Sequence, residues 1–488
     1  MTYPFLSRQS AFALLMAGGL ALVGCGGGTG ASAAPGSSSG NGSGSGTGTA
    51  PAATPVQVNL GDAPADWVMA FGMTVNSITL TSTTGTTVNV VPASTPMEMA
   101  QLMGTMQTVS TLAVPQGTYT QAVVSFSAVN LGYMNPVTKA YATATMPGPF
   151  TATVPFSPAA TVGASPMTLD FDLNLGASLS ADSTGAVSLS PVMTAALMPV
   201  STTGPTPWNG SLRMMGSVSG VTGTQFTLGS MMGLPTATFS TSGSTTFAGS
   251  GLTGMGGMAA GLMVAVDATL QADGSLLAQR VESLGMIGSA GMMGGGLVTG
   301  LTGNPPTQLT LSASAGQGGG MMPTSMGGTL TVSIPSGTPY AMDTDGVDLS
   351  GLPFAPDFSG ASLAKGQRVA VLSAGGMMTG GGMGGGMMGS GSLGTVTASQ
   401  VRLEPQALHG TVSGYAASGS QATFTLTLAA DSAFATLTSA TTIQVYQQAG
   451  TRMMGLQTPA NGQDLAVRGL LFNDAGTYRL VAAWVTTP

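Results

Sequence analysis

Apolar and polar residues alternate along much of residues 55–200, as they do in the strands of a half-buried sheet. The first such segment reads Val56-Gln57-Val58-Asn59-Leu60, and turns rich in Gly and Pro separate it from the later ones. The further alternating segments are Met73–Thr81, Thr87–Val91, Thr118–Val129, Thr151–Phe156, Met167–Leu175 and Ala186–Leu189. Residues 98–106 are predicted to form one or two helical turns. Short strands at this spacing predict a β-sandwich over residues 55–200.

Three related units follow from Trp208 onward, each with an opening strand, a second strand that ends in an aromatic residue or Leu, and two late strands. The opening strands are Gly216–Val221, Gly296–Leu301 and His409–Gly414. Each unit is predicted to fold as a small β-barrel. The predicted barrels span residues 208–284, residues 294–404 with a Gly/Met-rich insertion, and residues 407–488.

The N-terminal residues have a different pattern, in which Arg8 precedes the apolar run Ala11–Val23 and small residues lead up to Cys25. A positive residue, a short apolar stretch and a small-residue cleavage site are typical of a secretory signal peptide, here residues 1–24. The run is shorter than the roughly 20 apolar residues that a membrane-spanning helix needs. Residues 25–54 are rich in Gly and Ser, which indicates a flexible tether with an r.m.s. span of about 30 Å.

The stretch Leu22-Val23-Gly24-Cys25 resembles the lipobox of bacterial lipoproteins. The resemblance implies cleavage between Gly24 and Cys25, acylation of Cys25, with palmitate as an expected chain, and anchoring in a membrane. Gly26 stands where an Asp would favour retention in the inner membrane, which implies the outer membrane, on its periplasmic or surface face. The alternative is an ordinary signal peptide in which the cysteine is incidental.

Two further motifs lie within the predicted sandwich, Asp62-Ala63-Pro64-Ala65-Asp66 and Val114-Pro115-Gln116-Gly117-Thr118-Tyr119. Their order resembles a domain of unknown function in bacterial lipoproteins, which implies an immunoglobulin- or transthyretin-like sandwich with no established activity. The three later units resemble another exported family of unknown function that has OB-like barrels in tandem. The expected fold class is therefore all-β, a sandwich followed by about three OB-like barrels.

The charge content is low, since 6% of the 488 residues are charged and the formal net charge is −7. Removal of Arg8 with the signal would leave −8, and the ten Lys and Arg residues are scattered along the chain. Without a basic patch, nucleic acid is not an expected partner. Cys25 is the only cysteine and His409 the only histidine. One cysteine and one histidine are too few for a disulfide or a His/Cys zinc site, and they disfavour Ser-His-Asp hydrolysis. We therefore do not expect an enzyme.

A few carboxylates are candidates for chemistry. Asp343, Asp345 and Asp348 lie in one turn and either bind Ca²⁺ or are solvated, although the spacing is not that of an EF-hand. Asp62 and Asp66 are expected to shape their turn through hydrogen bonds to the backbone, with ligand binding as the alternative. Asp170 and Asp172 share one side of a strand, which predicts a solvated face rather than an acid–base pair. His409, at the start of a strand, is expected to be structural or exposed. These candidates predict no catalytic residue.

Methionine is unusually frequent, with 34 residues, and many occur as doublets in glycine-rich stretches. Thioether sulfur is a soft ligand that suits Cu(I). The candidate ligands are Met214, Met215, Met255, Met258, Met377, Met378, Met383, Met387 and Met388. The alternative is that methionine is an adaptable apolar filler or an oxidant-absorbing surface.

Together these features predict a non-enzymatic, lipid-anchored protein of the bacterial cell envelope. We expect a monomer that acts as a structural, binding or adhesion module and contacts polysaccharide or another envelope protein. The second hypothesis is a periplasmic or surface protein that binds Cu(I) or Ag(I) through its methionines. A carboxylate-based enzyme such as a glycosidase is the third and least favoured hypothesis. Cu(I) and Ca²⁺ are the two candidate cofactors.

Overall fold

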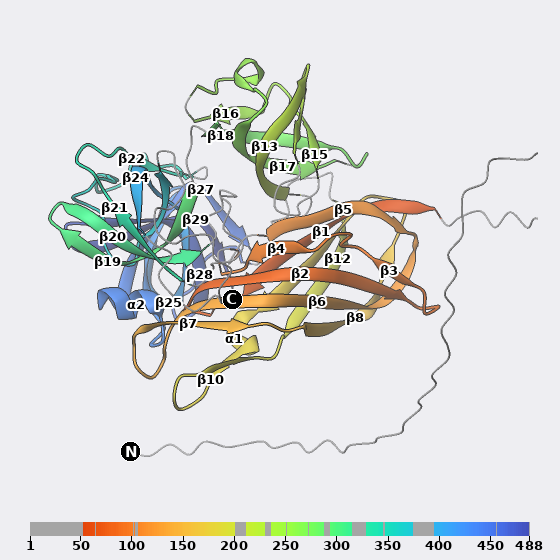
Figure 1. Ribbon diagram of the computed structural model, residues 1–488, viewed down its shortest axis with the longest axis horizontal. Coiled ribbons are helices and arrows are strands. Elements are labelled where there is room, and N and C mark those ends of the chain that lie inside the picture. Colours follow the sequence, from red (N-terminus) through yellow and green to blue (C-terminus); the bar gives the residue numbers. More distant parts are fainter. Residues whose placement is uncertain are drawn as a thin grey trace, which may run out of the picture. The chain divides into compact units, whose positions relative to one another are not determined.

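The computed structural model describes residues 52–63, 65–100, 102, 106–200, 211–229, 236–249, 251–271, 273–286, 293–314, 328–344, 347–373, 395–454 and 456–487. Strands make up 64% of these described residues and helices 4%, which confirms the prediction of an all-β fold (Figure 1). Within these ranges no helix is long and apolar enough to cross a membrane.

Residues 53–199 form a β-sandwich. One layer has the strand order β12-β9-β1-β5, with bounds Met193–Pro199, Met167–Asn174, Ala53–Ala63 and Met106–Pro115. The facing layer is built on β2 (Val68–Ser82) and β6 (Gly117–Met134), which pair along most of their length (Figure 1). Its shorter strands are β3 (Thr87–Asn89), β4 (Thr95–Glu98), β7 (Tyr141–Met146) and β8 (Phe150–Val162). The short elements α1 (Leu175–Ser178), β10 (Leu179–Ala181) and β11 (Val187–Leu189) follow β9.

The alternation in the sequence produces the sandwich core. Val56, Val58 and Leu60 of β1 are fully buried and pack with Phe126 of β6 and Phe171 of β9. Burying large apolar side chains between two sheets is the main stabilising contribution in such a fold.

The predicted Val114–Tyr119 motif turns β5 into β6. The Tyr119 hydroxyl donates a hydrogen bond to the Pro115 carbonyl at 2.8 Å, so the ring fastens its own turn while it remains buried in the core. This contact explains why Pro, Gly and Tyr occur together at that spacing.

The expectation of helical turns over residues 98–106 is wrong for the residues described there. Thr95–Glu98 is strand β4, Leu102 closes a turn by bonding to the Met99 carbonyl, and β5 begins at Met106. Met97 and Met99 are both buried, whereas a helix would separate positions two apart onto different faces.

Three five-stranded rings follow the sandwich. The first contains β13 (Ser211–Thr222), β14 (Gln225–Leu228), β15 (Ala237–Ser240), β17 (Leu262–Leu270) and β18 (Leu276–Met286). The second contains β19 (Met293–Gly303), β20 (Pro306–Ser314), β21 (Thr329–Ser333), β23 (Arg368–Ser373) and β24 (Thr395–Leu403). The third contains β25 (Gln406–Ser418), β26 (Gln421–Leu428), β27 (Thr442–Met454), β28 (Asp464–Asp474) and β29 (Thr477–Thr486). Outside the rings lie β16 (Thr246–Ala248), the 3-10 helix η1 (Met255–Gly257), β22 (Tyr340–Met342) and α2 (Ala433–Thr438).

All three rings have the same connectivity. The first strand pairs with the second and fourth, the third pairs with the second, and the fifth pairs with the fourth. The third and fifth strands pair in parallel in every ring. This repeated topology agrees with the prediction of small barrels in tandem after the sandwich.

The second and third barrels share apolar packing. Tyr446, Leu470 and Phe472 of the third barrel belong to the same buried cluster as the core of the second. Phe354, in the segment between β22 and β23, lies 5.2 Å from the Tyr446 ring and 5.7 Å from the Phe472 ring, measured between centroids. Breaking this contact would expose aromatic surface on both barrels.

The sandwich also shares a small apolar cluster with these barrels. Met69 and Met134 of the sandwich are buried with Ala433 of α2, and Leu297 of β19 and Leu437 of α2 pack against them. The first barrel is joined to the sandwich differently, through a parallel pairing of β13 with β5 at Arg213 and Gln107.

Candidate functional site

A buried polar face covers the side of β1 and β9 that points away from the sandwich core. The parallel register places Gln57 beside Thr168 and Asn59 beside Asp170. The Asn59 amide donates to Asp170 Oδ1 at 2.7 Å, and the Gln57 amide donates to Asn59 Oδ1 at 2.9 Å. Thr108 of β5 also donates to Asn59 Oδ1, at 2.8 Å, so the network extends over three strands.

The prediction that Asp170 and Asp172 lie on a solvated face is wrong. Asp170 is 5% exposed and Asp172 is only half-exposed. Alternation shows which side chains share a face of a strand, but it does not show whether that face is covered. Here β9 lies between β1 and β12, and its polar side chains are packed among those of neighbouring strands.

Three oxygen atoms of this face have no hydrogen-bond partner, namely Gln57 Oε1, Thr168 Oγ1 and Asp170 Oδ2. Burial raises the pKa of Asp170 to about 6, although the hydrogen bond from Asn59 acts in the opposite direction. A proton on Asp170 would provide a donor where acceptors are in excess. The face therefore favours the neutral carboxylic acid more than water does, up to about pH 6.

A cavity of about 60 Å³ lies at the end of the sandwich that faces the second and third barrels. Its polar lining side chains are Asp62, Asp66, Arg368, Gln406, Ser432 and Arg468. The remaining lining residues are apolar and include Met69, Leu175, Leu297 and Phe434. The cavity thus combines charged and polar groups with apolar side chains, as small-molecule sites do.

Asp62 is the unusual group in this lining. The expectation that it shapes a turn is not met, because Asp62 is the penultimate residue of β1 and is 6% exposed. Its Oδ1 atom has no hydrogen-bond partner. Burial, followed by the charges of Asp172 and Glu98, raises the pKa of Asp62, while a hydrogen bond from the backbone of Leu175 acts in the opposite direction.

Asp66, four residues later, lies in the turn and connects the sandwich to the third barrel. His409 Nδ1 of β25 lies 3.0 Å from Asp66 Oδ2, and the backbone N–H of Ala433 in α2 donates to the Asp66 carbonyl at 2.8 Å. The hydrogen bond to Asp66 raises the pKa of His409, with smaller contributions from Asp464 and Asp431, while burial opposes it. The only histidine of the chain therefore has a structural partner, which agrees with the expectation for it.

We expect the His409–Asp66 contact to contribute about 1 kcal/mol in a double-mutant cycle with His409→Asn and Asp66→Asn. The pKa of His409 is raised in the folded chain, so this stabilisation is fully present below the unfolded pKa and is lost as the pH rises through the folded value. Chemical denaturation at pH 5.5 and pH 8.5 should give a larger coupling at the lower pH. Equal coupling at the two values would show that the contact is not charge-assisted.

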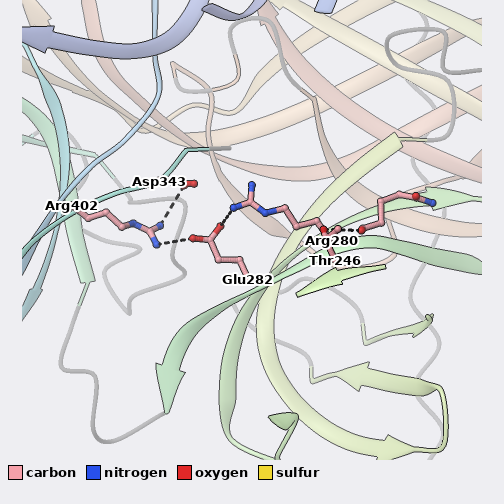
Figure 2. Close-up of polar contacts among 6 residues, drawn as sticks. Thr246, Arg280, Glu282, Asp343 and Arg402 are labelled. Atoms are coloured by element: carbon pink, nitrogen blue, oxygen red, sulfur yellow. Dashed lines mark hydrogen bonds and ion pairs between the residues drawn. The ribbon is translucent and has the colours of Figure 1, made fainter. Parts of the chain in front are cut away.

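An alternating chain of four charges joins the first barrel to the second. Arg402 of β24 lies between Glu282 of β18 and Asp343, at 3.4 Å from each, and Arg280 lies 3.2 Å from the other side of Glu282. Figure 2 shows the Arg402 guanidinium directed at both carboxylates. Arg402, Glu282 and Asp343 are each at most 9% exposed, which makes this a buried network rather than a surface one.

These contacts bear on the candidate Ca²⁺ turn. Asp343 is paired with Arg402, and Asp348 is exposed and accepts a hydrogen bond from the Ser350 backbone at 2.9 Å. Asp345 lies outside the described residues. No group of three His, Cys, Asp or Glu side chains within the described ranges is placed to hold a metal ion.

The candidate methionines that the structure describes belong to the first barrel. Met214 and Met258 are buried in its apolar core, and Met255 packs against that core. Met215 lies on β13, and its side chain is outside the description. The candidates Met377, Met378, Met383, Met387 and Met388 lie outside the described residues, as do Gly24 and Cys25. Met214, Met255 and Met258 therefore contribute to the apolar packing of the first barrel.

Sequence reasoning did not identify Glu98, Arg368 or Arg402 as important residues. Glu98 accepts a hydrogen bond from the Phe71 backbone at 2.8 Å, and Arg368 Nε lies 3.6 Å from Glu404 Oε2. The low charge content could have identified these residues. Only 6% of the chain is charged, and each charged residue within an apolar strand needs a partner.

Comparison with known proteins identifies one part of the chain. Residues 215–282, which run from β13 to β18, match the family model described as a domain of unknown function, DUF5666. The first barrel is a DUF5666 domain. No curated protein matches the chain. The DUF5666 domain contains Arg280 and Glu282, so the charged network of Figure 2 is a contact between this domain and the second barrel.

Proposed function

We propose that this chain is a non-enzymatic, lipid-anchored protein of the bacterial cell envelope that serves as a structural or binding module. The observation that supports this proposal most strongly is the nature of the contacts between its β-domains. Charge pairs and shared apolar clusters connect the sandwich and the barrels.

Such contacts suit a module that has to keep its domains in register. Inter-domain contacts within a chain are usually small and polar, and domain motion is then the default. Here Ala433 and Leu297 pack on Met69 of the sandwich, and His409 bonds to Asp66 beside them. Apolar burial and a charge-assisted hydrogen bond together hold the C-terminal barrel to the sandwich.

The proposal that the chain is not an enzyme rests on its residue supply. Its one histidine is engaged with Asp66, and its one cysteine is expected to carry lipid. The partners we propose are a membrane, through the lipid, and a polysaccharide or an envelope protein. The net charge of −7 disfavours nucleic acid.

The location is tested by replacing the proposed lipidation site. We expect the wild-type chain, expressed in a Gram-negative host, to sediment with the outer membrane and to incorporate labelled palmitate. The Cys25→Ser variant should incorporate no label and should be absent from the outer-membrane fraction, because a single serine cannot form the thioether that carries the lipid. A Ser37→Cys control on the Cys25→Ser background places a cysteine in the tether and should not restore labelling. Equal labelling of the wild type and Cys25→Ser would contradict lipid attachment at this residue.

A further inference from the structure

The cavity between the sandwich, β19 and α2 contains a buried carboxylate oxygen whose bonding capacity is not used by the protein. Asp62 lines this cavity, is 6% exposed, and its Oδ1 atom has no hydrogen-bond partner. Leaving a buried acceptor unsatisfied costs about 1–3 kcal/mol, and more for a charged group. A ligand that donates a hydrogen bond at this point would remove that cost.

We propose that this cavity binds a small aliphatic ammonium compound, with the ammonium group against Asp62 and the alkyl group against the apolar wall. An ammonium group offers a positive charge and three N–H donors, as the side chain of lysine does. The hydrogen bond to a carboxylate would be charge-assisted and therefore stronger than a neutral one.

The charges around Asp62 favour a cation over an anion on that side of the cavity. Asp172 and Glu98 are close enough to disfavour a second negative charge on Asp62, and Asp66 also lines the cavity. Arg368 lines it as well, but its guanidinium is paired with Glu404, and Glu98 is a further charged neighbour. Arg468 is the other cationic lining residue and already interacts within the protein. An ammonium ion at Asp62 would therefore offset a local excess of carboxylates.

Size and wall chemistry limit the alkyl group. A buried water needs about 10–15 Å³ of accessible space, so a cavity of about 60 Å³ holds only a few non-hydrogen atoms. Met69, Leu175, Leu297 and Phe434 provide an apolar surface for one or two carbon atoms. A divalent metal fits less well, since Ca²⁺ takes six to eight oxygen ligands and the described residues bring no three metal-binding side chains together.

The test is a titration of the purified chain, residues 25–488, with methylammonium, ethylammonium, cyclohexylammonium, tetramethylammonium and acetate at pH 8 and constant ionic strength. Isothermal titration calorimetry and thermal denaturation are the two readouts. We expect saturable binding and a rise in Tm with methylammonium and ethylammonium. Tetramethylammonium has the same charge but no N–H donor, and cyclohexylammonium is too large, so neither should bind. These comparisons use the wild-type chain alone and do not depend on a variant that folds.

The Asp62→Asn variant should weaken ethylammonium binding at least about tenfold, the loss expected for one charge-assisted hydrogen bond. Asp170→Asn is the matched control, because Asp170 is a buried carboxylate of the adjacent strand β9 that does not line the cavity, and it should bind as the wild type does. The proposal is overturned if no alkylammonium saturates, if tetramethylammonium or acetate binds as well as ethylammonium, or if Asp62→Asn binds with unchanged affinity.

Discussion

Replacement of Arg402 with methionine is expected to destabilise the chain by about 3–5 kcal/mol, the cost of removing one partner from a buried charge pair. Arg402 lies between Glu282 and Asp343 in the network of Figure 2. Its loss leaves two carboxylates within a buried region, with Arg280 remaining on one side of Glu282. Methionine keeps much of the side-chain volume, so the change tests charge rather than packing.

Urea denaturation monitored by tryptophan fluorescence and circular dichroism measures this loss. Lys365→Met is the matched control, since Lys365 is an exposed cation of the second barrel, and it should change stability by less than about 0.5 kcal/mol. Adding Asp343→Asn to Arg402→Met should recover part of the loss, because the Asp343 charge is then removed while Glu282 keeps Arg280 as its partner. An Arg402→Met chain as stable as the wild type would show that the network does not hold the DUF5666 domain to the second barrel.

The Asp170→Asn substitution is expected to stabilise the chain at pH 8 by up to about 3 kcal/mol, the equivalent of a pKa raised from 3.8 to about 6. A folded-state pKa above the unfolded value means that the folded chain binds the proton more tightly. The corresponding stability is fully present below about pH 3.8 and is lost as the pH rises through about 6. Asparagine is neutral at every pH and its amide adds N–H donors where Gln57 Oε1 and Thr168 Oγ1 lack partners.

The measurement is the free energy of unfolding of both proteins between pH 4.5 and pH 8. The wild type should lose stability relative to Asp170→Asn as the pH rises, with most of the change near pH 6. Asp182→Asn is a control in which the change in stability at pH 8 should have the opposite sign. Hydrogen bonds from Thr184 and Ala186 lower the pKa of the exposed Asp182. That variant should lose stability at pH 8 and match the wild type more closely at low pH. A difference between wild type and Asp170→Asn that does not vary with pH would contradict a proton held on Asp170.

The pattern of the sequence predicted the strands well because alternation is a local property. Val56, Val58 and Leu60 alternate with polar residues and point into the core, and the three repeated units close into rings of one topology. The Val114–Tyr119 motif was also informative, since Tyr119 bonds within its own turn. Each of these features depends on residues that are near one another in the chain.

The site features could not be predicted in the same way because their partners are far apart in sequence. Asp66 and His409 are 343 residues apart, and Arg402 and Glu282 are 120 apart. Alternation placed Asp170 on the polar side of β9, but only the assembled sheet shows that this side is buried. Likewise, Asp62 was expected in a turn because Pro64 follows it, yet strand β1 continues to Ala63.

The low charge content has a structural consequence. Many of the charged residues that the structure describes are buried where domains meet, among them Glu98, Glu282, Asp343, Arg368, Arg402 and Arg468. A buried ion pair contributes little net stability compared with apolar residues of the same shape, but it penalises any arrangement that separates the partners. We infer that these charges fix how the barrels and the sandwich dock, while Ser, Thr and Gly provide the solvated surface.

The central claim, that this is a lipid-anchored envelope protein, is tested most directly by mass spectrometry of the N-terminal peptide of the chain purified from membranes. The account predicts a mature chain that begins at Cys25 and carries fatty acyl groups on that residue. An N-terminus at any other residue, or a peptide in which Cys25 is unmodified, would contradict it.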